Sequence, residues 1–283
     1  MMLNYIVWRF NPHIFPNTTL HIGDYYFSSL AWYGLTFALG LVFCYLFVQY
    51  AFKRENCSEN VFGKITIWLV IATIVGARLG HCLFYEPAYY LSHPLEILKT
   101  YKGGLASHGA AIALFIAVIL LGKKYHFSWV WLIDRLAVGV AVAGSLIRLG
   151  NFFNSEIYGV ETSLPWGVIF VRNGETVPKH PTQIYEALAY ILIFALLFFL
   201  YKRKGKNIKE GLLFGLFLTL VFVFRFLVEF IKNPQVDFEK GMALNMGQLL
   251  SIPFIIIGLY FLFLYKKKDN LYGPVEGKHT ATA

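Results

Sequence analysis

The chain has 283 residues, of which 57% are hydrophobic, 18% aromatic and only 14% charged. Because about 25% of the residues in an average soluble domain are charged, this composition excludes an ordinary soluble protein and favours one embedded in a lipid bilayer. The net charge of +9 requires no nucleic acid, since lysines and arginines beside anionic lipid account for it.

Seven apolar runs reach or approach the length of about 20 residues that a membrane-spanning helix needs. We expect these spans near residues 30–52, 65–85, 105–121, 129–149, 184–201, 212–231 and 249–265. The predicted fold class is therefore an all-α polytopic membrane protein with about seven transmembrane helices. The first 27 residues contain Pro12, Pro16 and several polar residues, which is not the pattern of a cleaved signal peptide.

The lysines and arginines between the spans predict the orientation. Fourteen of them follow the first, third, fifth and seventh spans, whereas seven lie on the opposite side. The positive-inside rule then places the N-terminus outside and the C-terminus in the cytoplasm. We expect residues 1–268 to form a single integral membrane catalytic domain, followed by a polar, disordered cytoplasmic tail at residues 269–283.

One sizeable loop, at about residues 150–181, is expected on the outer face. Its segment "VETSLPWGVIF" predicts a short strand or an interfacial helix. The segment "VRNGET" predicts a turn, since Asn173-Gly174 is a usual hairpin signal. The cysteines show no spacing typical of a disulfide framework or a zinc site, so they are expected to be packing residues; they are Cys44, Cys57 and Cys82.

Ionisable and polar residues gather at one depth of the predicted spans. Charged groups inside a bilayer cost about 2.5–3.5 kcal/mol each on insertion scales, so each requires a reason. On six spans such residues lie toward the outer leaflet, and they are Tyr33, Arg78, His81, His108, Arg148, Glu186, Arg225 and Glu229. In contrast, Asp134 and Arg135 lie toward the cytoplasmic end and are expected to be structural.

Each residue also has a structural explanation of its own. An arginine at a helix end usually extends to the headgroups, Arg225 and Glu229 are four residues apart and can neutralise each other, and Glu186 can belong to a capping pattern with Thr182. A lone histidine in a span is more often a packing residue than a catalyst. None of these explanations predicts that the residues converge at one depth.

Several cations facing the outer leaflet suit an anionic lipid headgroup. Guanidinium binds phosphate in a bidentate manner, so Arg148 and Arg225 can hold one phosphate from two sides. Asn151 and Asn154 offer donors for a glycerol hydroxyl. The chain contains no HExxH, GxSxG or Walker A sequence. Three classes remain: a phospholipid-handling enzyme, a carrier for an anionic solute, and a structural membrane protein.

The segment "RLGNFFNSEIYG" at residues 148–159 closely resembles the signature of the prolipoprotein diacylglyceryl transferases, roughly GRxGNFxNxExxG. Six further segments resemble motifs of that family in the same order, and they are "AWYGL", "GARLGHCLFY", "GGLASHGA", "HPTQIYE", "FRFLVEF" and "MGQLLSIP". One such motif would be weak evidence, whereas this series covers nearly the whole chain at the predicted ends of spans.

The resemblance implies transfer of the diacylglyceryl group of phosphatidylglycerol to the thiol of the lipobox cysteine of a preprolipoprotein. A thioether forms and glycerol-1-phosphate leaves, at the outer leaflet of a bacterial inner membrane, without a metal or other cofactor. The candidate catalytic residues are His108, Arg148 and Arg225, with His108 assisting loss of the thiol proton. The candidate substrate-binding residues are Tyr33, Arg78, Asn151, Asn154, Glu156, Gly159 and Glu229, the last holding the Arg225 guanidinium in place.

The chain departs from the family pattern at four positions. Ile147 and Ala110 stand where glycines are usual, Lys102 where an acidic residue is common, and Val221 where a tyrosine is frequent. If that tyrosine normally partners the histidine, the role of His108 is affected most. The alternatives left open are a non-catalytic carrier or flippase for an anionic phospholipid, and an inactive homologue of the transferase.

Overall fold

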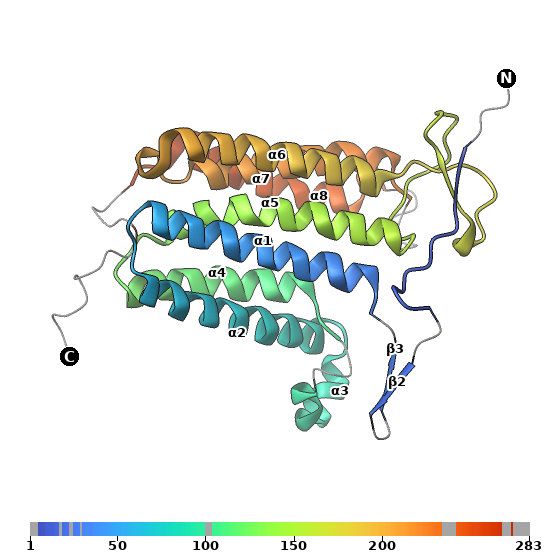
Figure 1. The fold of residues 1–283 in the computed structure, drawn as a ribbon, viewed down its shortest axis with the longest axis horizontal. Helices are drawn as coiled ribbons and strands as arrows, with labels where there is room; N and C mark the ends of the chain where they lie inside the picture. Colours follow the sequence, from blue (N-terminus) through green and yellow to red (C-terminus); the bar gives the residue numbers. More distant parts are fainter. Residues whose placement is uncertain are drawn as a thin grey trace. The chain divides into compact units, whose positions relative to one another are not determined.

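The computed structural model describes residues 5–16, 19–22, 25–28, 30–99, 104–233, 242–267 and Gly273. Within these residues, seven helices are long and apolar enough to cross a membrane (Figure 1). They are α1 (Trp32–Arg54), α2 (Glu59–Phe84), α4 (Ser107–Lys124), α5 (Trp129–Phe153), α6 (Thr182–Lys204), α7 (Leu212–Val228) and α8 (Met246–Leu259). All seven expected spans are confirmed, and the chain is a multi-pass membrane protein.

The chain divides into two compact units, which are described separately. The first unit comprises Met1–Val48 and Asp134–Lys266, and the second comprises Gln49–Ile133 and Lys267–Ala283. The single catalytic domain expected from the sequence remains a prediction. The expected cytoplasmic tail lies outside the described residues apart from Gly273.

The first unit is built around α5, α6, α7 and α8, which run alongside one another in Figure 1. Helix α7 packs against both α6 and α8. The Ser145 hydroxyl of α5 donates to the Ala187 carbonyl of α6 at 2.9 Å. A Cβ atom on Gly40 of α1 would lie 2.9 Å from the Ala143 backbone of α5, so a small residue permits this close helix approach.

Asp134 and Arg135 are buried at the end of the first unit where α7 begins. The Asp134 carboxylate accepts hydrogen bonds from the backbone amides of Gly211 and Phe214, both at 2.8 Å. It thereby satisfies amides that α7 leaves unpaired in its first turn. The Arg135 guanidinium lies over the Tyr201 ring, 5.8 Å from the centroid. This arrangement agrees with the structural role expected for the pair.

Two short sheets accompany the helices. Strand β1 (Ile6–Trp8) pairs in parallel with β4 (Val168–Phe170), and β2 (Thr19–Ile22) pairs antiparallel with β3 (Tyr25–Ser28). Of the two alternatives for "VETSLPWGVIF", the strand is therefore correct. The turn expected at Asn173-Gly174 is confirmed: it is a 3₁₀ turn ending with Gly174 at φ +76°. The segments on either side of it pair antiparallel at Val168 and Lys179.

In the second unit, α2 packs against α4 through glycines. A Cβ atom on Gly80 of α2 would lie 2.7 Å from the Cα atom of Gly109 of α4, and one on Gly76 would meet the Gly109 carbonyl oxygen. Gly76 and Gly80 form a GxxxG pattern, which allows two helix backbones to approach closely in a membrane. Helix α3 (Pro87–Ser92) and a 3₁₀ turn at Pro94–Leu98 follow α2.

Candidate functional site

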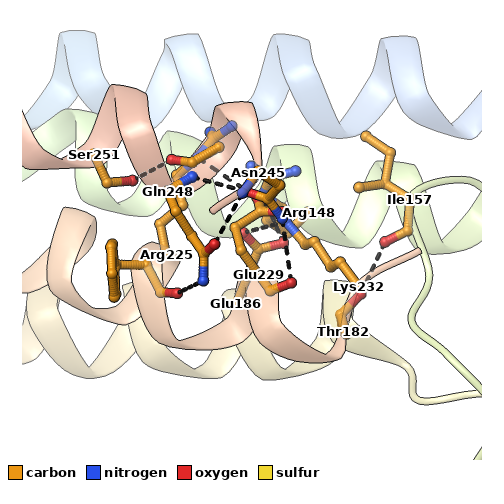
Figure 2. Close-up of polar contacts among 12 residues, drawn as sticks. Arg148, Ile157, Thr182, Glu186, Arg225, Glu229, Lys232, Asn245, Gln248 and Ser251 are labelled. Atoms are coloured by element: carbon orange, nitrogen blue, oxygen red, sulfur yellow. Dashed lines mark hydrogen bonds and ion pairs between the residues drawn. The ribbon is translucent and has the colours of Figure 1, made fainter. Parts of the chain in front are cut away.

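Five charged side chains form a continuous series of ion pairs in the first unit (Figure 2). Arg148 Nε of α5 lies 3.3 Å from Glu186 Oε2 of α6. Lys232 Nζ lies 3.1 Å from Glu186 Oε1 and 3.2 Å from Glu229 Oε1. Arg225 Nε of α7 lies 3.8 Å from the same Glu229 oxygen. We call Arg148, Glu186, Lys232, Glu229 and Arg225 the ion-pair chain.

The ion-pair chain lies where α5 and α7 end and where α6 begins. The antiparallel course of successive spans brings these helix ends together, although the residues are far apart in sequence. The sequence-based expectation that Arg148 and Arg225 come from different helices to one place is supported by this geometry. The ion-pair chain carries three cations and two carboxylates, so one positive charge is in excess.

Exposure differs strongly along the ion-pair chain. The side chains of Glu186 and Lys232 are 0% and 2% exposed, that of Arg148 is 14% exposed, and that of Arg225 is 33% exposed. Glu229 is the only described residue whose side chain pairs with the Arg225 guanidinium. Arg225 Nε is buried without a hydrogen bond, and no described residue accepts a hydrogen bond from the two Nη groups of this partly exposed side chain. The Arg225 guanidinium therefore has donors available for an added anion.

Asn151 extends the site from Arg148 into the loop after α5. Its Oδ1 accepts from Arg148 Nη1 at 3.4 Å, and its Nδ2 donates to Glu156 Oε1 at 2.7 Å. The Gln183 side chain of α6 donates to the Glu156 carbonyl at 2.6 Å. Ile157 has φ +60°, which is a strained conformation for a β-branched residue. The hydroxyl of Thr182 donates to the Ile157 carbonyl at 2.8 Å, which helps to hold that conformation.

The first turn of α8 holds Glu229 from the other side. Asn245 Nδ2 donates to Glu229 Oε2 at 3.2 Å and to the Glu229 carbonyl at 3.3 Å. Asn245 also forms a capping box with Gln248, because each side chain accepts from the other's backbone amide. A Cβ atom on Gly247 would lie 2.6 Å from Glu229 Cδ. The start of α8 therefore leaves room for this carboxylate and positions it.

Three other candidate residues of the first unit lie around this site in different ways. Tyr33 of α1 lies near Gly150, where an added Cβ atom would be 2.9 Å from the tyrosine ring. Gly159 is buried, and its amide donates to the His180 carbonyl at 2.8 Å. A Cβ atom there would meet the Ile231 carbonyl, so the glycine permits close backbone packing. The Asn154 side chain has no hydrogen-bond partner among the described residues.

Arg78 of the second unit donates its guanidinium hydrogens to the backbone. Nε donates to the Ile97 carbonyl at 2.9 Å, Nη1 to that of Gly104 at 3.2 Å, and Nη2 to that of Glu96 at 2.6 Å. The guanidinium carbon also lies 5.0 Å from the centroid of the Tyr90 ring. Arg78 thus fastens the segment after α2, and its substrate-binding role remains a prediction.

His108, the candidate proton acceptor, is the second residue of α4 and is exposed. Its ring lies 5.3 Å from that of Phe84 and 5.8 Å from that of Tyr85, between centroids. None of the described residues forms a hydrogen bond with its ring nitrogens. His108 and the ion-pair chain belong to different units, so their joint action remains a prediction.

The loop of the first unit contains two titratable groups with shifted pKa values. Burial lowers the pKa of His180, whose Nδ1 lies 3.2 Å from the Tyr185 hydroxyl. Burial would also lower the pKa of Lys179, but the hydrogen bond and charge of Glu175 outweigh this effect and raise it. Lys179 Nζ lies 3.2 Å from Glu175 Oε2 and 3.5 Å from Glu161 Oε1.

Four residues of this site were not among the sequence-based candidates. The sequence indicates that Glu186 is either one of the polar groups at the outer depth or a capping group with Thr182, and its carboxylate pairs with Arg148 and Lys232. Lys232, Asn245 and Gln248 were missed altogether. The spacing offers a signal for Lys232, because Arg225, Glu229 and Lys232 stand at i, i+4 and i+7 on one helical face. No comparable periodicity identifies Asn245, whose contact depends on how α8 packs against α7.

Comparison with known proteins gives a consistent result. A sequence model described as prolipoprotein diacylglyceryl transferase matches residues 21–264. A Bacteroides fragilis protein named phosphatidylglycerol–prolipoprotein diacylglyceryl transferase is 41% identical over 278 residues, covering 94% of this chain and 97% of the relative. Proteins of the same name from Tolumonas auensis and Porphyromonas gingivalis are 46% and 44% identical. They cover 85% and 91% of this chain, and 93% and 94% of their own lengths are matched.

Proposed function

The chain belongs to the prolipoprotein diacylglyceryl transferase family, and from this premise we propose that it transfers the diacylglyceryl group of phosphatidylglycerol to a lipobox cysteine of a preprolipoprotein. A bond forms between the cysteine sulfur and the glyceryl carbon, and the bond between that carbon and the phosphate oxygen breaks. The electron pair of the broken bond stays on the phosphate oxygen, and glycerol-1-phosphate leaves.

The observation that carries the proposal is the excess positive charge of the ion-pair chain, together with the accessible guanidinium of Arg225. Negative charge grows on the phosphate as the carbon–oxygen bond breaks. A guanidinium directed at that oxygen stabilises the transition state more than the ground state. Arg225 has donors available for this contact, whereas Arg148, 14% exposed, already pairs with Glu186. We assign Arg225 the direct contact with phosphate, supported by Arg148.

The attacking thiol must lose its proton, because the thiolate is the nucleophile and a free cysteine has a pKa of about 8.5. We assign acceptance of this proton to His108, directly or through another group. Its exposed ring, without a hydrogen bond from any described residue, supports that assignment. On the side of the ion-pair chain, Tyr33, Asn151 and Glu156 would orient the glycerol portion of the lipid.

Reconstitution tests this function most directly. Purified protein is combined with phosphatidylglycerol and a lipobox peptide, and the peptide is analysed by mass spectrometry. We expect the peptide to gain the mass of one diacylglyceryl group. The gain should disappear with Arg148→Ala and with a peptide whose cysteine is replaced by serine. A well-folded protein that binds phosphatidylglycerol but forms no adduct would instead indicate a lipid carrier or an inactive homologue.

We further propose that the protein resides in the bacterial inner membrane with its N-terminus outside, its C-terminus in the cytoplasm and the ion-pair chain toward the outer leaflet. The lysine-rich segment after α6 supports this orientation through the positive-inside rule. Single cysteines at Arg203→Cys and Thr176→Cys, introduced after replacement of the native cysteines, form a matched pair of exposed positions. An impermeant reagent on intact cells should label the second alone, and preferential labelling of the first would reverse the orientation.

A further inference from the structure

Lys232 occupies the centre of the ion-pair chain. Its ammonium group lies between two carboxylates, 3.1 Å from Glu186 and 3.2 Å from Glu229, and its side chain is 2% exposed. Each of these carboxylates also contacts one arginine, Glu186 contacting Arg148 and Glu229 contacting Arg225. No other described cation contacts both glutamates. The two arginines are therefore linked to each other through this lysine.

We propose that Lys232 is a positioning residue for the transfer reaction, which holds Glu186 and Glu229 together and thereby sets Arg148 and Arg225 for one lipid phosphate. The phosphate part of this inference rests on the proposed function. Two buried carboxylates repel each other, and a cation between them offsets this repulsion. Without Lys232, each glutamate would attract its arginine more strongly, and the ion-pair chain would lose its excess positive charge.

The surroundings of Lys232 fix its side chain in this place. The Gly159 backbone bridges to that of Lys232, and the Val160 amide donates to the Ile231 carbonyl at 2.9 Å. The Asn233 side chain donates to the Gly159 carbonyl at 3.1 Å. These contacts tie the segment after α7 to the loop after α5. Gly159, expected from the sequence to bind substrate, thus also helps to place Lys232.

Four variants of the full-length protein test the proposal: Lys232→Met, Lys232→Arg, Glu186→Gln, and Lys232→Met combined with Glu186→Gln. Lys232→Met removes one cation, so the ion-pair chain is left with two cations, two carboxylates and no net charge. We expect a loss of about a hundredfold in kcat/KM for phosphatidylglycerol, because misplacement of a catalytic group by about 1 Å can cost about that factor. Because binding of the anionic lipid weakens, KM should rise as well as kcat fall. Lys232→Arg keeps the charge and should retain most of the activity.

The double variant separates positioning from a merely structural role. Replacing Glu186 by glutamine removes the negative charge that Lys232 balances, so the net charge returns to one positive. We expect the double variant to recover about tenfold over Lys232→Met, although two residues have changed instead of one. A double variant that folds but is no more active than Lys232→Met would overturn the proposal, as would near-native activity of Lys232→Met.

Lys179 provides a matched control, because it also lies between two glutamates and its side chain is 11% exposed. Lys179→Met should change stability without raising the KM for phosphatidylglycerol. A similar rise in that KM would show that the Lys232 effect is not specific to the ion-pair chain, and would overturn the proposal.

A binding readout distinguishes failure of this proposal from failure of the proposed function. Preferential binding to the native state raises thermal stability. Each variant is therefore heated in nanodiscs of phosphatidylcholine with and without phosphatidylglycerol. Stabilisation by phosphatidylglycerol should be present in the native protein, lost in Lys232→Met and regained in the double variant, even if no peptide adduct forms. Equal stabilisation of the native protein and Lys232→Met would overturn the role of Lys232 whatever the outcome for catalysis.

Discussion

Arg225 and Arg78 were both expected from the sequence to meet a substrate, but the structure uses the two guanidinium groups differently. Arg78, which is 4% exposed, donates to three backbone carbonyls and lies against the Tyr90 ring. The side chain of Arg225 is 33% exposed, and among described residues its guanidinium pairs with Glu229 alone. A buried arginine near the end of a span therefore indicates a binding site only if its donors remain available.

The largest effect is expected for Arg225→Lys. The substitution keeps the charge but removes the planar fork that binds phosphate in a bidentate manner. Loss of one donor to a developing oxyanion typically lowers kcat about 10²–10³-fold. We expect the rate of adduct formation to fall by a factor approaching this range. Thermal unfolding of the same preparation provides the control for folding. Full activity of a folded Arg225→Lys protein would remove Arg225 from phosphate binding.

Arg78→Gln should have the opposite profile, with a large effect on stability and a smaller one on the chemical step. A hydrogen bond to a charged group contributes about 1.5–3 kcal/mol, and the variant loses most of three such bonds. We expect a lower Tm and faster proteolysis within residues 86–99, the segment that Arg78 fastens. If Arg78→Gln keeps its Tm and the KM for phosphatidylglycerol rises, Arg78 binds substrate as the sequence predicted.

The features that the sequence predicts are those that depend on local residue patterns and on the length needed to cross a membrane. The seven spans follow from the lengths of the apolar runs. The similar depth of Arg148 and Arg225 in the membrane follows from their positions near the ends of their spans. The partners of these residues depend on helix packing that the sequence does not encode locally. Glu186 and Lys232 are 46 residues apart, yet their charged groups lie 3.1 Å apart. The pairing of β1 with β4 was not predicted for the same reason, because the two strands are far apart in sequence and meet only in the folded chain.

A third effect, smaller than the first two, is expected for Gly247→Ala. The added Cβ atom would lie 2.6 Å from Glu229 Cδ, and this carboxylate cannot move freely because Lys232 and Asn245 hold it. Overpacking of this kind costs about 1–3 kcal/mol. Displacement of Glu229 should disturb Arg225 and lower kcat/KM about tenfold, equivalent to about 1.4 kcal/mol.

Gly63→Ala is the matched control for Gly247→Ala. A Cβ atom on Gly63 of α2 would meet nothing within 4 Å. Alanine in an exposed helix is favoured over glycine by up to about 1 kcal/mol, so this variant should be as active as the native protein and no less stable. Equal activity of both alanine variants would show that the start of α8 does not position Glu229 for the reaction.

The smallest effect concerns His180, which lies in the loop and not in the ion-pair chain. Burial lowers its pKa in the folded state below the ordinary value of about 6.5. The unfolded chain therefore binds the proton more readily, so this residue destabilises the fold as the pH falls below about 6.5 and until the lower folded-state pKa is passed. The Tm of the native protein should fall more steeply between pH 7 and 5 than that of His180→Gln. The two proteins differ only at residue 180, so the difference in slope isolates His180, and parallel slopes would show that its titration is not coupled to folding.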